Sequence, residues 1–288
     1  MISSMRDLVA AENEGKTNFA TWRKTPSQAT VAGIWFDLSM SPGNPVPNYY
    51  AASPLVSTAL AQSTDGGISH GGNVGQLGYK KFVKTMMVLN TSANAAPNYL
   101  MLLDYLLYYP FVDMSVTDEQ PLINTVPLPR YTSGVGVQIM AVQVAAQSGV
   151  GNPQFFCTYT NSDGVTGRTT RTVACNTTVV TGAVITSAQA TNSSVGPFLP
   201  LQAGDKGVRS IESVTFLTPD IGLISLVLVG PVENICLRTI DAPAERVPVI
   251  DFFDFPQVQD DAYLNLICCP NASLAGTPFH GYLQTVWG

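Results

Sequence analysis

The sequence predicts a mainly β protein, either an antiparallel β-sandwich or a jelly-roll-like domain, with an N-terminal arm and few short helices. Strand-like runs recur about every ten residues, turn residues separate them, and almost no long segment has the 3.6-residue period of a helix. The 288 residues suffice for one large all-β domain or two smaller lobes. We expect a helix and extended arm over residues 1–32, then a β-rich domain over residues 33–288 that can divide into two lobes.

The N-terminal segment predicts one helix followed by the arm. Ser4 precedes Asp7 by three residues, which is a capping-box pattern at the start of a helix. Residues 16–32 are polar, with Phe19 and Trp22 as their large apolar anchors. Two interpretations stay open. The segment is an extension lying on its own domain, or it is an arm that reaches a neighbouring subunit through these two aromatic side chains.

Two irregular segments follow. Four prolines in Ser41–Pro54 predict an extended loop, and its adjacent Tyr49 and Tyr50 are candidate interface residues. Asp65–Gly78 is glycine-rich, but its spacing matches neither GxGxxG nor a P-loop, so nucleotide binding is not favoured. We expect His70, within this segment, to be a solvent-exposed turn residue.

Strand patterns dominate the rest of the chain. Leu55–Gln62 is compatible with a short helix, and Tyr99–Tyr109 with a buried strand or a short core helix. After the strand-like Phe155–Thr160, the sequence Asn161–Gly164 contains an Asp-Gly pair, the strongest turn signal in the chain. Further strands are predicted at Val135–Gln147, Ile211–Leu217, Ile221–Val229 and Glu233–Ile240.

The composition favours a protein with covered surfaces. Charged residues make up 12% of the chain, about half the usual share, while 45% are apolar. Uncharged and apolar surface needs a partner, so we expect a subunit covered by copies of itself or by other proteins. The alternative is a monomeric β-domain rich in Thr and Asn.

The charge pattern disfavours nucleic acid and membranes as direct partners. The net charge is −6, and no Lys/Arg run exceeds a pair, whereas phosphate binding needs clustered basic groups. Residues 1–15 lack the basic and apolar regions of a signal peptide. The longest apolar run, Tyr99–Tyr109, is interrupted by Asp104 and is shorter than the roughly 20 residues that span a bilayer.

Cysteine and histidine usage predicts neither a cofactor nor a metal. The five cysteines form no CxxC pair, and there are two histidines, so a zinc site is not favoured. Cys157 and Cys175 flank the predicted hairpin, but free buried thiols are expected for a protein made in a reducing cytosol.

We expect no catalytic residues. His70 and His280 are the available imidazole bases, and no GxSxG-like motif is present. Four acids leave an alternative open, because paired carboxylates can serve a glycosidase or bind Ca²⁺; they are Asp251, Asp254, Asp260 and Asp261.

Five distinctive segments resemble a family of structural proteins encoded among the virion genes of tailed bacteriophages. They are LLDYLLYYPFVDMSVTDEQ (Leu102–Gln120), LPRYTSGVGVQ (Leu128–Gln138), YTNSDGVTGRTT (Tyr159–Thr170), PFLPLQAGDKGVRSIESVTF (Pro197–Phe216) and GYLQTVWG (Gly281–Gly288). The resemblance covers most of the chain from about Trp35 onward and includes no catalytic signature.

The resemblance implies a virion component made in the host cytoplasm. It would be a capsid decoration, cement or minor head protein, or alternatively a tail or adaptor-ring subunit. Its partners would be the major capsid protein and copies of itself, for example as a trimer. The candidate interface residues are Phe19, Trp22, Tyr49 and Tyr50, and deletion of residues 1–26 is expected to weaken attachment while leaving the domain folded.

A rival class is a carbohydrate-binding or carbohydrate-hydrolysing β-protein of the virion surface. It would stack sugars on tyrosines and use the acids between Asp251 and Asp261 as polar partners. The tyrosines are Tyr49, Tyr50, Tyr108 and Tyr109.

Overall fold

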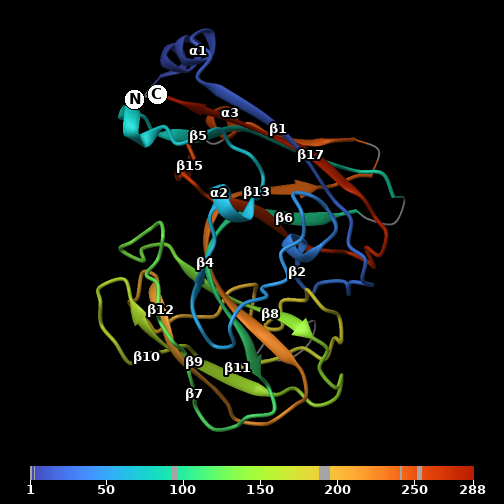
Figure 1. Ribbon diagram of the computed structural model, residues 1–288. Coiled ribbons are helices and arrows are strands. Elements are labelled where there is room, and N and C mark those ends of the chain that lie inside the picture. Colours follow the sequence, from blue (N-terminus) through green and yellow to red (C-terminus); the bar gives the residue numbers. More distant parts are fainter. Residues whose placement is uncertain (1, 3, 93–95, 188–194, 241, 252–254) are drawn as a thin grey trace.

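Strands dominate the chain (Figure 1). The computed structural model describes residues 2, 4–92, 96–187, 195–240, 242–251 and 255–288, which form three antiparallel sheets and a few short helical elements. The prediction of a mainly β fold, with antiparallel sheets packed as in a sandwich, is confirmed.

The helical elements are short. They are α1 (Met5–Asn13), α2 (Gln62–Asp65), α3 (Pro248–Asp251) and the 3-10 turns η1 (Leu38–Met40) and η2 (Gly75–Leu77). The predicted cap at Ser4 is confirmed, because its hydroxyl oxygen accepts a hydrogen bond from the Asp7 N–H at 3.2 Å.

The first sheet, which we call the terminal sheet, joins the two ends of the chain. Its order is β14-β5-β17-β1-β3, and β15 also pairs with β5. The strands are β1 (Thr17–Lys24), β3 (Gly43–Asn44), β5 (Lys81–Asn90), β14 (Ala244–Arg246), β15 (Gln257–Val258) and β17 (Phe279–Trp287). Both termini lie at the outer end of this sheet, near α1 (Figure 1).

The central sheet is built on two long strands. Its order is β2-β16-β6-β13-β8, and β4 also pairs with β6. The strands are β2 (Phe36–Asp37), β4 (Thr58–Ala59), β6 (Asn98–Asp113), β8 (Gln138–Ala145), β13 (Leu223–Leu237) and β16 (Tyr263–Cys269). β6 and β13 pair from Asn98↔Leu237 to Asp113↔Leu223 with three register shifts, which bend the ladder.

The distal sheet lies at the other end of the molecule. Its order is β10-β9-β12-β7, and β11 also pairs with β9. The strands are β7 (Gln120–Pro121), β9 (Gln154–Asn161), β10 (Arg168–Thr169), β11 (Val173–Ala174) and β12 (Val208–Phe216). The predicted turn after β9 is confirmed, because the Gly164 N–H donates to the Asn161 carbonyl at 3.0 Å and Gly164 has a φ of 80°.

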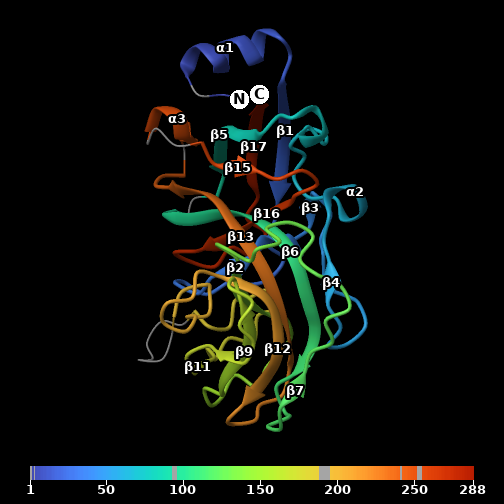
Figure 2. The same cartoon turned by 90° about the vertical axis from the view of Figure 1, so that its left-hand side faces the viewer.

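One face of the central sheet packs against both other sheets. Its upper part meets the terminal sheet through Leu100, Leu102, Ile235 and Leu237, and its lower part meets the distal sheet through Leu106, Val112, Ile224 and Leu226. Figure 2 shows β6 and β13 running through the middle of the molecule toward the distal sheet. The chain therefore has two sandwich cores that share the same two strands.

The expectation of an arm over residues 16–32 is wrong for Thr17–Lys24. This segment is β1, which pairs with β17 along its whole length and with β3 at its end. Trp22 is 2% exposed and packs directly over Gly281, where a Cβ atom would lie 2.3 Å from the indole ring. The sequence of β1 resembled an arm because its solvent face is polar and because its buried face includes a charged residue, Lys24. Because its main partner is β17, residue 32 does not separate it from the β-rich domain.

Two other expectations need correction. Leu55–Gln62 is not a helix, since β4 pairs with β6, the Leu60 N–H donates to the Leu106 carbonyl at 3.0 Å, and α2 begins only at Gln62. The two strands predicted on either side of Pro231 are one continuous strand, β13, in which a register shift accommodates the proline.

Candidate functional site

The four candidate interface residues divide into two exposed and two buried side chains. Phe19 is 60% exposed and Tyr49 is 56% exposed, so both remain available for contacts. The ring of Phe19 lies 5.0 Å from that of Tyr282 on the neighbouring strand. Trp22 and Tyr50 are buried, and they therefore cannot be contact residues on the surface of the folded chain.

Tyr50 belongs to a buried network around Asp37. The Asp37 carboxylate accepts hydrogen bonds from the Tyr50 hydroxyl, from the Tyr105 hydroxyl at 2.7 Å, and from the Ser39 hydroxyl and N–H at 2.8 Å each. Burial raises the pKa of Asp37, and these hydrogen bonds act in the opposite direction. Tyr50 has a φ of 53°, so the network fixes the end of the proline-rich loop in a strained backbone conformation.

Lys24 attaches the same loop to β1. Its side chain is buried, and Nζ donates to the carbonyl oxygens of Ser41 at 3.1 Å and Ser39 at 3.4 Å. Burial lowers the pKa of Lys24 to about 8, while the charge of Asp37 acts to raise it. The lysine therefore serves as a structural cation within the packing of the loop.

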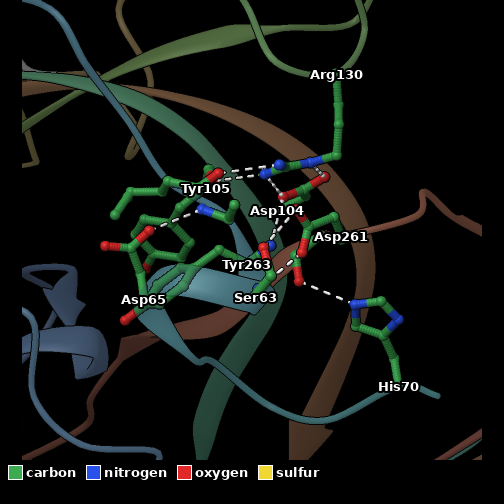
Figure 3. A network of polar contacts seen from close by, with 11 residues as sticks. Ser63, Asp65, His70, Asp104, Tyr105, Arg130, Asp261 and Tyr263 are labelled. Carbon is green, nitrogen blue, oxygen red and sulfur yellow. Dashed lines mark hydrogen bonds and ion pairs between the residues drawn. The ribbon is translucent and has the colours of Figure 1, made fainter. Parts of the chain in front are cut away.

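A second buried network centres on Asp104 and Arg130 (Figure 3). Arg130 donates to both Asp104 carboxylate oxygens, from Nε at 2.9 Å and from Nη2 at 2.6 Å. Its remaining donors reach the carbonyls of Leu60 and Tyr105 at 2.9 Å each, and the Tyr263 N–H donates to Asp104 at 3.1 Å. Burial raises the pKa of Asp104, and Arg130 opposes this shift. The sequence signal for this network was a carboxylate inside an apolar strand, which must find a cationic or hydrogen-bonding partner.

The expectation that His70 is solvent-exposed is wrong. Its side chain is fully buried, with Nε2 lying 3.0 Å from the Ala262 carbonyl and Nδ1 lying 2.9 Å from Nζ of the equally buried Lys81. Burial is the main cause that lowers the pKa of His70 to about 4, and the charge of Lys81 adds to it. The glycine-rich segment therefore folds around a lysine of this chain.

Glycines in this segment permit close approach to neighbouring backbone and rings. Gly67 and Gly71 have positive φ angles. A Cβ atom on Gly67 would lie 3.0 Å from the Leu264 carbonyl oxygen, and one on Gly71 would lie 3.0 Å from the Trp287 ring.

The acids considered for a glycosidase or Ca²⁺ site have separate structural roles. Asp260 accepts from the Val74 and Gly75 N–H groups at 3.1 and 2.6 Å, and Asp261 accepts from the Ser63 N–H and hydroxyl at 2.7 and 2.9 Å. Asp251 accepts from the Val247 N–H at 2.9 Å. Asp254 lies outside the described residues. Among the described residues, no group of three or more His, Cys, Asp or Glu side chains is arranged to hold a metal ion.

The tyrosines considered as sugar-stacking platforms do not form a surface. Tyr50 and Tyr109 are fully buried and Tyr108 is 5% exposed, which leaves Tyr49 exposed. Tyr109 donates its hydroxyl to Asn124 at 2.6 Å inside the distal half. These three rings are parts of the cores.

Cys157 and Cys175 are separate buried thiols. Val173 pairs with Phe155, so the register sets Cys175 opposite Pro153, four residues from Cys157. At about 3.3 Å per residue the offset is roughly 13 Å, beyond the Cα separation of a disulfide. Burial raises the pKa of both thiols, which makes them poor nucleophiles.

The described surface has several open hollows, and two of them are considered for catalysis. One, of about 480 Å³, is lined by residues that include Cys236, Arg238 and Asp251, and the other, of about 520 Å³, is lined by residues that include Thr160 and Arg209. No histidine is among the described residues that line these two hollows, and Thr160, which lines the second, donates its hydroxyl to the Glu212 carboxylate at 2.7 Å.

Comparisons with known proteins give no family for this chain. No family model and no curated protein matches it. The solved structures with a weak likeness include the VP2 subviral particle of infectious bursal disease virus and a mutant VP2 of the same virus in T=1 particles. The first has a TM-score of 0.19 at 6% identity and covers 94% of this chain and 80% of that chain. The second has a TM-score of 0.18 at 7% identity and covers 94% and 77%. TM-scores this low carry no argument about fold or function. In the described part of the chain, no helix has the length and apolar character needed to cross a membrane.

Proposed function

We propose that this chain is a structural subunit of a tailed-phage virion, a capsid decoration, cement or minor head protein that binds the major capsid protein and copies of itself. The proposal rests on one contrast. The candidate side chains that are buried take part in internal packing or hydrogen bonds, whereas several large apolar side chains are exposed on the surface. These exposed side chains include Phe19, Tyr49, Leu77, Val150, Ile221 and Ile250. The sequence resemblance described above supports the same class of protein.

The low share of charged residues suits this exposed apolar surface to contacts with other subunits. Burying a large apolar side chain contributes about 1.5–3 kcal/mol, so a few such contacts per subunit suffice for a useful interface. In a symmetric shell the same contact is repeated in every copy, and a subunit that binds the assembled state stabilises it by mass action. A structural role therefore needs the surface of this chain and requires no catalytic residue.

The number of copies per particle is the first test. Quantitative mass spectrometry of purified particles, calibrated against the major capsid protein, should give a ratio comparable to that of the capsid protein. A few copies per particle would place the chain in a tail or adaptor ring instead. Absence from purified particles would contradict a virion role.

A surface substitution tests which face binds. We expect Phe19→Ser to lower the affinity for particles that lack this chain at least tenfold, about 1.4 kcal/mol, because an exposed aromatic side chain is a typical interface anchor. Thr21→Ser, on the exposed side of the same strand, is the matched control and should bind like the wild type. Equal binding of the two variants would exclude this face and leave the other exposed residues to be tested.

The carbohydrate alternative depends on Tyr49, the exposed one of the four tyrosines considered as sugar-stacking platforms. Its test is a glycan array with the wild-type chain and Tyr49→Ala. Binding that is lost in the variant would favour a sugar-binding protein and would count against a purely structural role.

A further inference from the structure

Residues 66–79, which include most of the glycine-rich segment, are anchored in part by one buried ammonium group. Their other anchors include the Ile68 N–H, which donates to the Leu264 carbonyl at 2.8 Å, and the His70 carbonyl, which accepts from the Thr285 hydroxyl at 2.7 Å. Nζ of Lys81, on β5, lies 3.1 Å from the Gly71 carbonyl, 2.8 Å from the Gly72 carbonyl and 2.9 Å from Nδ1 of His70. An ammonium group has three hydrogens, and these three atoms are its nearest acceptors. Asp260 is a further neighbour at 3.4 Å and balances the charge.

The contact between the two side chains requires a neutral imidazole. Nε2 of His70 faces the carbonyl oxygen of Ala262 at 3.0 Å, so Nε2 carries the hydrogen and donates it. The lone pair of Nδ1 is then free to accept from Lys81. A second proton on the ring would occupy that lone pair, remove the acceptor and place two cations about 2.9 Å apart.

The charged groups around His70 do not stabilise a second proton on its ring. The charged groups that act on the ring are Lys81 from β5, Arg130 from the loop before β8, and Asp260 from the loop before β16. The first two disfavour an imidazolium, and Asp260 contacts Lys81 as well as the Val74 and Gly75 N–H groups. Among the described residues, no carboxylate makes a hydrogen bond to the ring of His70.

We propose that His70 and Lys81 form an acid-sensitive latch, in which protonation of His70 breaks the contact and releases residues 66–79 from the terminal and central sheets. The released part includes η2 and the Val74 and Gly75 amides, which bind Asp260 while the latch is closed. The opening is local, because β5 and β17 keep their own ladder.

The sign of the pH dependence follows from the two states. The histidine pKa is about 4 in the closed state, against 6.5 for a free imidazole. Between these pH values the open state binds a proton that the closed state does not, so the opening constant should rise about tenfold per pH unit as the pH falls. Above pH 6.5 the latch should not respond to pH, and below pH 4 the response should level off.

Hydrogen exchange on the whole chain tests the latch. Protection factors, corrected for intrinsic exchange, would be measured between pH 7 and pH 4 for peptides covering residues 66–80 and, as an internal reference, residues 154–161 of β9. We expect protection of residues 66–80 to fall about tenfold per pH unit below pH 6.5, and that of residues 154–161 to stay level.

Two variants make the test specific. His70→Gln keeps one acceptor and one donor but cannot be protonated in this range, so residues 66–80 should lose their pH response. His280→Gln removes the other imidazole of the chain and should behave like the wild type. A pH response that persists in His70→Gln, or a flat response in the wild type, would overturn the proposal.

A direct measurement covers the case in which His70→Gln does not fold. In His280→Gln the remaining imidazole is His70, and its ¹⁵N resonances report both tautomer and charge. A neutral ring protonated at Nε2 down to pH 5 supports the latch, whereas an imidazolium at pH 6 contradicts it.

Discussion

At the scale of single residues, the Arg130–Asp104 pair makes the clearest stability prediction. Arg130→Met leaves Asp104 buried without its cation, which should lower the free energy of unfolding by about 3–5 kcal/mol. Asp104→Leu combined with Arg130→Met removes both charges and should recover at least half of that loss, although the Tyr263 N–H loses its acceptor. Urea unfolding of the wild type, both single variants and the double variant measures the coupling. Additive losses would show that the pair is not coupled.

The same pair shows how far a sequence defines a site at this scale. Asp104 interrupts an apolar run, and a buried carboxylate needs a partner, but the identity of that partner depends on a contact across 26 residues that no local pattern encodes. Tyr50 was missed for a related reason. Its neighbour Tyr49 has the same side chain and the same proline-rich surroundings. Tyr50 is the buried ring because it contacts Asp37 and Tyr108, which lie elsewhere in the sequence.

At the scale of elements, the N-terminal helix and the first strand should respond differently to deletion. Removing residues 1–13 takes away α1, which packs through Leu8 and Ala11 on Phe82 and Val286, and should leave a folded but less stable chain. Removing residues 1–26 also takes away β1, the strand between β17 and β3, together with Trp22. The sequence led us to expect that this deletion leaves the domain folded. Because β1 is an inner strand of the terminal sheet, we instead expect the product to lack a cooperative thermal transition by circular dichroism. A cooperative transition near that of the shorter deletion would contradict the place of β1 in the sheet.

Elements with a strong local signal were predictable, and elements defined by distant partners were not. The Asp-Gly turn after β9 follows from turn chemistry. The hydrophobic run at Tyr99–Tyr109 was compatible with a buried strand or a short core helix, and the structure shows the strand β6. β1 is mostly polar, and its assignment as a strand depends on β17, more than 250 residues later in the chain. Pro231 similarly indicated a break, whereas the structure accommodates it in a register shift within β13.

At the scale of the whole molecule, the two cores share their longest strands. β6 contributes Leu100 and Leu102 to the core of the terminal sheet and Leu106 and Val112 to the core of the distal sheet. Unfolding of one core would expose part of β6 and β13, the two strands on which the other core is also built. The division into two lobes visible in Figure 1 therefore does not imply two independent folding units.

This shared framework predicts one unfolding transition for the chain. None of the three tryptophans lies in the distal core: Trp22 is in the core of the terminal sheet, Trp35 is in a separate buried cluster with Leu103 and Tyr105, and Trp287 is on β17. Cys157 and Cys175, in contrast, are buried in the distal core. Tryptophan fluorescence and pulsed thiol labelling of the two cysteines should thus give the same midpoint in urea. The exposed Cys236 reacts at all urea concentrations and sets the baseline for labelling. If the cysteines become reactive at lower urea than the fluorescence change, the distal sheet unfolds alone and β6 and β13 do not couple the two cores.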